Sequence, residues 1–113
     1  DHCLKVVAIT KNDLFIPILT HVYGEAQLGG KAAVVSTYRL NTGLDTVDMV
    51  DFMDRVAKEA IHELGHTFDL RHCEDPLCIM HYSRKIADVD HKMNQFCRYC
   101  SIFLSDNIKA LEK

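Results

Sequence analysis

The chain has 113 residues with 48 % apolar and 26 % charged side chains, which suits a single domain with one small core. Its net charge of −3 excludes the basic surface of a typical nucleic-acid-binding protein. No apolar run approaches the ~18 residues of a membrane span, and no secretory signal pattern is present. The chain begins at Asp1 and not at Met, so we interpret it as a processed or trimmed piece of a longer protein.

The first forty residues predict a small sheet. Leu4–Thr10 is β-branched and almost continuously apolar, which is typical of a buried strand. The segment Lys11–Thr20 contains turn-forming residues and predicts an irregular connection. Val22–Leu28 and Ala32–Leu40 are apolar-rich runs on either side of Gly29-Gly30, which predicts a hairpin.

A long helix follows the turn at Asn41-Thr42-Gly43. Asp45 or Thr46 is a suitable N-cap, Asp48 suits the first turn, and the helical pattern continues to about Phe68. Apolar residues recur at three- and four-residue steps and form one stripe of an amphipathic helix: Val50, Met53, Ala57, Ile61 and Leu64.

The last third predicts loops and a closing helix. Cys73–Asp90 has mixed periodicity and is expected to be rich in loops. Cys97–Lys113 predicts a helix, with four side chains available for burial: Ile102, Phe103, Ile108 and Leu111.

The long helix contains the motif His62-Glu63-Leu64-Gly65-His66. Residues four apart lie on one helix face, so the imidazoles of His62 and His66 can share a cation. Glu63 then lies where its carboxylate reaches a water molecule on that cation without binding the metal. A catalytic zinc site needs a third protein ligand, and both His72 and Asp69 are candidates by spacing.

Five cysteines are present, and the odd count argues against a closed disulfide framework. Four of them form two close pairs separated by a longer span, which is typical of a zinc site in a reducing compartment: Cys73, Cys78, Cys97 and Cys100. Two disulfides or unpaired thiols are the alternative for these four. Cys3 has no partner in this pattern and is interpreted as a free, buried thiol.

The combined motifs resemble those of the archaemetzincins (archaelysins), a family of metzincin metallopeptidases. The resemblance is carried by the three histidines at positions 62, 66 and 72, by Cys73 directly after the third, by Cys78-Ile79-Met80, and by Cys97-Arg98-Tyr99-Cys100. It covers about residues 4 to 104, and the combined motif is highly specific.

The resemblance implies a set of roles for these residues. His62, His66 and His72 would bind a catalytic zinc ion, and Glu63 would act as the general base towards a zinc-activated water. The four paired cysteines would bind a second, structural zinc. Met80 would lie in a methionine turn below the histidines. Tyr82 would stabilise the oxyanion, or else be an ordinary core or surface tyrosine.

Two departures from the family pattern affect these expectations. Asp69 stands where a glycine is usual, at a helix end that requires positive φ, and Asp tolerates that conformation at some cost. Family members also have an N-terminal part of the sheet that this sequence lacks. We therefore expect an N-terminally shortened, metzincin-like α/β domain over residues 1–113, with a small mixed sheet packed on the zinc helix, a cysteine-clamped loop region and a C-terminal helix.

The function predicted on this basis is zinc-dependent peptide hydrolysis by a cytoplasmic monomer that binds neither nucleic acid nor membranes. The residues 22–28 would form the antiparallel edge strand beside the cleft, where an extended peptide can add to the sheet, or else an ordinary outer strand. The alternative function is a non-catalytic binding module in which only the cysteine site holds zinc. Hydrolysis of a non-peptide amide is a third interpretation of the same residues.

Overall fold

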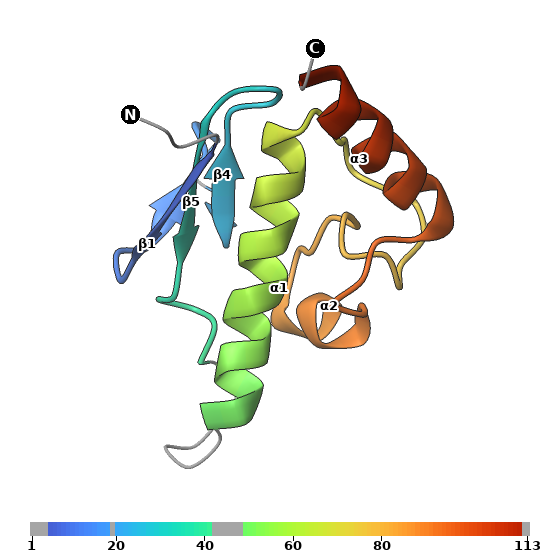
Figure 1. The fold of residues 1–113 in the computed structure, drawn as a ribbon. Helices are drawn as coiled ribbons and strands as arrows, with labels where there is room; N and C mark the ends of the chain where they lie inside the picture. Colours follow the sequence, from blue (N-terminus) through green and yellow to red (C-terminus); the bar gives the residue numbers. More distant parts are fainter. Residues whose placement is uncertain (1–4, 19, 42–48, 112–113) are drawn as a thin grey trace.

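The computed structural model describes residues 5–18, 20–41 and 49–111. A three-stranded sheet lies on one side of the long helix α1 (Met49–Thr67), and helix α3 (Arg98–Leu111) lies on the other side (Figure 1). The short helix α2 (Ile86–His91) lies beside the lower half of α1 in this view. The predicted α/β architecture, with a small sheet packed on a long helix, is therefore confirmed. No helix in the described residues is both long and apolar enough to cross a membrane.

The main sheet is mixed and has the strand order β1-β5-β4. Strand β1 (Val6–Thr10) is parallel to β5 (Ala32–Ser36), and β4 (Gly24–Ala26) is antiparallel to β5. The predicted hairpin across Gly29-Gly30 is thus confirmed, although β4 is shorter than the predicted strand. Two short segments, β2 (Leu14–Phe15) and β3 (His21–Val22), form a separate antiparallel pair within and after the connection predicted to be irregular.

The expectation that the first strand is buried is wrong for the described part of it. Val6 is 51 % exposed and Ile9 is 60 % exposed, because β1 is an edge strand of the described sheet. An apolar run shows that a strand suits burial on both faces, but it does not show what covers them. Leu4 lies outside the described residues.

The apolar stripe of the long helix is not its buried face. Val50 is 83 % exposed and Met53 is 56 % exposed, whereas several charged and polar residues of the same helix are buried. The buried positions are Arg55, Val56, Lys58, Glu59, His62, Glu63, Gly65 and Thr67. Helical periodicity located the helix, which ends at Thr67, close to the predicted end at about Phe68. It did not identify which face of the helix is buried. The predicted N-cap residues lie outside the described residues.

The charged residues buried on α1 have specific partners, as the cost of burying a charge requires. Arg55 forms a bidentate ion pair with Asp90 (2.8 and 2.7 Å) and donates to the Leu40 carbonyl (2.9 Å). Lys58 donates to the Val89 carbonyl oxygen (3.1 Å). These contacts attach the end of α2 to the middle of α1.

The C-terminal region is mainly loop before α3, as predicted, but helix α2 was not predicted there. The four α3 side chains expected to be buried are 37–58 % exposed, and that expectation is wrong. Cys100 is the buried residue of α3 in the described range. Its helix packs through the cysteines against a second core cluster that also contains Leu70, Cys78, Ile79 and Met80.

Candidate metal centres and cleft

Three histidines converge at the C-terminal part of α1. His62 and His66 lie one helical turn apart, and their Nε2 atoms are 3.2 Å from each other. The His72 ring centroid lies 5.4 Å from that of His62 and 4.9 Å from that of His66. Donor atoms of all three lie within 4.8 Å of one another. Of the two candidates for the third position, the structure brings His72 to this cluster, while the exposed Asp69 is not part of it among the described residues.

The imidazole orientations fit a metal cation. His62 Nδ1 donates to the Ile79 carbonyl oxygen (2.8 Å), and His66 Nδ1 donates to the Leu70 carbonyl oxygen (2.7 Å). A carbonyl oxygen only accepts, so the proton of each neutral ring is on Nδ1 and the Nε2 lone pairs face each other. Such hydrogen bonds orient histidine ligands in metal sites.

Burial favours the neutral form of the three histidines. Desolvation lowers the pKa of His62 well below its ordinary value, with the positive charge of Lys92 adding to the effect. Desolvation also lowers the pKa of His66 and of His72. A neutral imidazole is the form that binds a metal ion, so the lowered pKa values favour cation binding by this cluster.

A sharp turn after α1 brings His72 back towards the helix. Asp69 has φ of 68°, the left-handed conformation that the position requires. The Asp69 amide donates to the His66 carbonyl (2.9 Å), and the Leu70 amide donates to the Gly65 carbonyl (3.1 Å). These two bonds form a Schellman motif, the common helix ending. Asp69 therefore forms the left-handed turn for which the resemblance led us to expect a glycine.

Further hydrogen bonds join the end of α1 to the sheet. The ammonium of Lys5 donates to the carbonyls of Thr67 and Gly30, both at 2.6 Å. The Gly29 amide donates to the His66 carbonyl (2.9 Å). The tip of the β4–β5 hairpin is thereby held against the helix end. This contact fixes the distance between the sheet and the histidine cluster.

The Glu63 carboxylate lies between α1 and strand β4, in space that is open only because residue 24 is a glycine. A Cβ atom at position 24 would lie 2.7 Å from Glu63 Oε2 and 2.8 Å from the Val34 carbonyl oxygen. Gly24 therefore leaves the space that the carboxylate occupies. Burial, together with the negative charges of Glu59 and Glu25 and against the opposing charge of Lys92, raises the pKa of Glu63 to about 8.

Met80 packs against α1 at Gly65, which lies between the two motif histidines in the sequence. Its side chain is fully buried, and a Cβ atom at position 65 would lie 2.5 Å from its Sδ atom. Gly65 thus allows the methionine to pack against the helix backbone. The contact supports a packing role for Met80, which an ordinary core methionine would also have.

A cleft of about 670 Å³ runs between α1 and β4. Its walls include the three histidines, Glu63 and Tyr82. Tyr82 is 36 % exposed, and its ring centroid lies 4.9 Å from that of His72. The tyrosine is therefore at the cleft surface beside the histidine cluster and not in the core.

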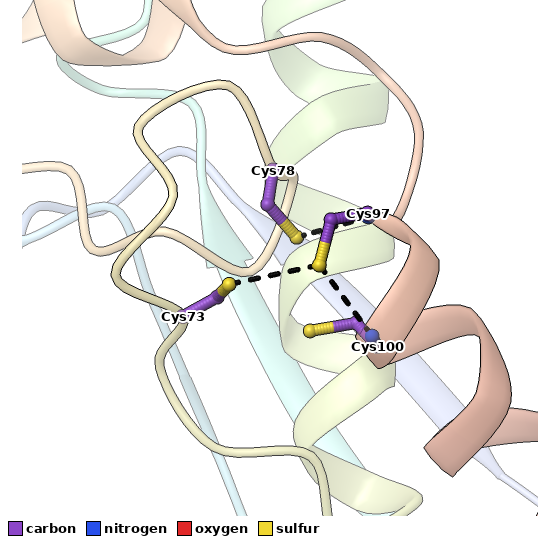
Figure 2. A group of neighbouring side chains, drawn as sticks. All are labelled: Cys73, Cys78, Cys97 and Cys100. Atoms are coloured by element: carbon purple, nitrogen blue, oxygen red, sulfur yellow. Dashed lines mark hydrogen bonds between the residues drawn. The ribbon is translucent and has the colours of Figure 1, made fainter.

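The four paired cysteines form a second cluster (Figure 2). Their sulfur atoms lie within 4.8 Å of one another, and all four are free thiols. The Cys73 and Cys97 sulfurs are 3.8 Å apart, far beyond the ~2.05 Å of a disulfide bond. Cys73 and Cys78 come from the loop after α1, while Cys97 and Cys100 come from the start of α3.

Backbone amides support negative charge on this cluster. The amides of Met80 and Cys97 donate to the Cys78 sulfur (3.4 and 3.3 Å), and the Cys100 amide donates to the Cys97 sulfur (3.5 Å). Tetrahedral zinc sites bind thiolates, which these donors stabilise. The residues thus fit a closed structural zinc site.

The sequence analysis did not identify the ion pair between Glu59, which lines the cleft, and Lys92. Glu59 lies on the same helix face as His62 and Glu63, so helical spacing could have identified it. Lys92 is fully buried with its ammonium 3.3 Å from Glu59 Oε1. No motif marks Lys92, because only the packing of the chain after α2 brings it to the helix.

Comparison with known proteins identifies the family. The model of Peptidase family M54 matches residues 2–106. The chain belongs to this family. It is 45 % identical over 105 residues to the archaemetzincin of Methanopyrus kandleri, which covers 93 % of this chain and 58 % of that protein. The resemblance inferred from the motifs is therefore confirmed.

Solved structures of similar proteins have the same fold. The crystal structure of the Methanopyrus kandleri archaemetzincin matches with a TM-score of 0.87 and 44 % identity, over 94 % of this chain and 57 % of that one. The Archaeoglobus fulgidus archaemetzincin, crystallised with malonate, gives 0.81 and 38 %, over 91 % and 62 %. A zinc-dependent peptidase from Methanocorpusculum labreanum gives 0.82 and 37 %, over 88 % and 53 %. The chain thus spans a little over half the length of these relatives.

Proposed function

We propose that this chain hydrolyses peptide bonds with a zinc ion bound by His62, His66 and His72. The observation that carries the proposal is the convergence of three oriented imidazoles and the Glu63 carboxylate in one cleft. A zinc ion bound there would supply the Lewis acidity that activates a water molecule and polarises the scissile carbonyl.

Glu63 is the general base of the proposed reaction. Its carboxylate lies in the cleft beside the histidines, and burial raises its pKa to about 8. A base with a pKa near the working pH can both accept and return a proton. Glu63 would take the proton of the attacking water and then deliver it to the leaving amine. The Tyr82 hydroxyl would donate a hydrogen bond to the carbonyl oxygen as that oxygen gains charge.

The substrate would bind as an added strand on β4. The amide of Gln27 donates to the Ala32 carbonyl (3.0 Å), and the carbonyl of Tyr23 accepts from Ser36 (2.9 Å). Polar groups alternate in direction along an antiparallel strand, so those of Gly24 and Ala26 point away from β5. Both residues line the cleft, where an extended peptide backbone can pair with them.

The four-cysteine cluster is proposed to hold the second, structural zinc ion. Its thiols link the loop carrying Met80 to α3, and a closed site of this kind contributes to folding and not to chemistry. Reduced thiols of this kind suit a reducing compartment, so we infer a cytoplasmic location.

The zinc count per folded chain tests this assignment. Native mass spectrometry of protein purified without chelator should give two zinc ions, and one in the His66→Ala variant. A peptide-library assay of the same preparation should then detect cleavage. One zinc ion in both proteins would contradict the proposal and favour the binding-module alternative, in which only the cysteine cluster holds metal. Cleavage of small amides but not of peptides would favour the third interpretation.

A further inference from the structure

Arg71 places a fixed positive charge on the wall of the cleft. The residue is exposed and directly precedes His72, and it lines the cleft together with the histidine cluster. Among the described residues that line this cleft, Arg71 is the only arginine or lysine. A guanidinium stays protonated at every working pH, so this part of the wall is cationic under all conditions of interest.

The guanidinium of Arg71 has no partner within the described part of the chain. Two other arginines are each held by a carboxylate through bidentate contacts: Arg39 by Asp13 and Arg55 by Asp90. The side chain of Arg71 makes no such ion pair or hydrogen bond with any described residue. A guanidinium presents a planar fork of donors that matches a carboxylate, so its free donors suit an anionic group of a ligand.

Arg71 also has open space around it. It lines the cleft and, in addition, a second cavity of about 430 Å³ whose walls include Tyr99 and Asn107 of α3. The exposed carboxylate of Asp69 lines this second cavity but not the cleft. A ligand in the cleft can therefore reach the guanidinium without displacing packed side chains.

The position of Arg71 along the cleft is set by the β4–β5 hairpin. Gly24, at the start of β4, lies against Glu63, whereas the Gly29 amide at the hairpin tip donates to the His66 carbonyl at the end of α1. The tip thus meets the turn that leads to Arg71. A strand added antiparallel to β4 runs from the tip towards Glu63, so its residues before the scissile bond lie at the Arg71 end.

We propose that Arg71 is a specificity-determining residue that selects an acidic side chain on the N-terminal side of the scissile bond. This inference rests on the proposed peptidase function and names the class of substrate that the cleft prefers. A Glu or Asp carboxylate of the substrate accepts two hydrogen bonds from the guanidinium, while the isosteric Gln or Asn gains no ion pair. The carboxyl groups of Glu25 and Glu63 line the same cleft and disfavour an acidic side chain elsewhere in it.

The test uses acetylated tripeptides that end in a hydroxamate, a group that chelates zinc and requires no turnover. The peptide then extends to the N-terminal side of the zinc ion. Glu, Gln or Lys is placed in turn at each of the three residues, and dissociation constants are measured by calorimetry on the zinc-loaded chain. The Glu compound should bind about fivefold more tightly than the Gln compound at one position, the size expected for a partly exposed ion pair. The Lys compound should bind more weakly than the Gln compound there, and about 0.5 M NaCl should reduce both differences.

Charge exchange at Arg71 locates the preference. Arg71→Glu should reverse the order, so that the Lys compound binds more tightly than the Glu compound, and Arg71→Gln should abolish the preference. Lys11→Glu introduces the same change in net charge at an exposed residue outside the cleft, and it should leave the ratio of the Glu and Gln constants unchanged. Native mass spectrometry checks that each variant retains the zinc ion beside the altered residue.

The outcomes separate the subsite from the peptidase function. If the compounds bind but Glu and Gln are equal at all three positions, the subsite is overturned and the zinc peptidase proposal stands. The subsite is also overturned if Arg71→Glu keeps the Glu preference, or if Lys11→Glu removes it as fully as Arg71→Gln does. If no compound binds the zinc-loaded chain, the peptidase proposal fails and the subsite fails with it.

Discussion

The histidine cluster and the cysteine cluster, the two sets of candidate metal ligands, differ in how the fold encloses them. The histidine cluster lies on a rigid helix and the turn after it, and it opens into a cleft that includes the half-exposed Tyr82. The cysteine cluster joins a loop to α3, and Cys78 and Cys100 are 1 % and 7 % exposed. An open cluster leaves a coordination position for chemistry, while a closed cluster can only hold the chain together.

The two clusters are also physically connected. Cys78 is followed by Ile79, whose carbonyl orients the His62 ring, and by Met80, which packs below Gly65. The closed cluster therefore supports the groups that orient the open one. The same hydrogen bond ties the cysteine loop to His62, whereas the ring of His66 bonds the Leu70 carbonyl, outside the segment between the cysteines. Variants in the two clusters should differ accordingly.

The largest effect is expected from Cys78→Ser. Loss of the cysteine site should release the loop and α3, and should lower the free energy of unfolding by more than about 4 kcal/mol, because structural metal is a large part of the stability of small domains. Zinc should be lost from both clusters. Thermal unfolding and native mass spectrometry measure both quantities. The comparison variant is His66→Ala, which should lose one zinc ion and keep the fold. Equal melting temperatures for wild type and Cys78→Ser would refute the dependence.

Glu63→Gln should separate chemistry from metal binding at the open cluster. Peptide hydrolysis should fall by at least about 10²-fold, the usual contribution of a general base, while the zinc count stays unchanged. Glu25→Gln is the matched control, since Glu25 is an exposed carboxylate of the same cleft. Equal losses of activity in the two variants would mean that hydrolysis depends on the negative charge of the cleft and not on Glu63 as a general base.

Gly24→Ala tests whether the sheet positions the base. The added methyl group would overlap the Glu63 carboxylate, and a misplacement of about 1 Å can cost 10²-fold in rate. We expect kcat to fall by about 10²-fold with both zinc ions retained, as measured by steady-state kinetics and native mass spectrometry. Ala26→Gly removes a methyl group from the same strand and should leave kcat unchanged. A fully active Gly24→Ala variant would show that Glu63 has room to move.

Ala26→Pro should give the smallest effect and concerns only substrate binding. Proline removes the amide that points away from β5, and proline is tolerated on edge strands. KM should rise about tenfold with kcat little changed, the size expected for a lost hydrogen bond. Ala26→Gly keeps the amide and serves as the control. An unchanged KM would argue against strand addition at β4.

Local sequence signals predicted the elements better than they predicted burial. The hairpin, the end of the long helix and the final helix were placed within a few residues, because turn glycines and helical periodicity are local properties. The helix face was misjudged, because Arg55, Lys58 and Glu59 are buried by partners distant in sequence. Several apolar residues of β1 and α3 that were expected to be buried are exposed, Val6, Ile9 and Phe103 among them, because their covering depends on tertiary packing and not on the local sequence pattern.

The sequence by itself determined the chemistry that is available to this protein. The spacing of the histidines on one helix and the two cysteine pairs follow from helix geometry and ligand preference, so they are readable without coordinates. Only the tertiary structure decided that His72 and not Asp69 joins the histidines, that Gly24 makes room for Glu63, and that Lys92 lies below Glu59. Each of these depends on a contact between segments far apart in the chain, which no local pattern specifies.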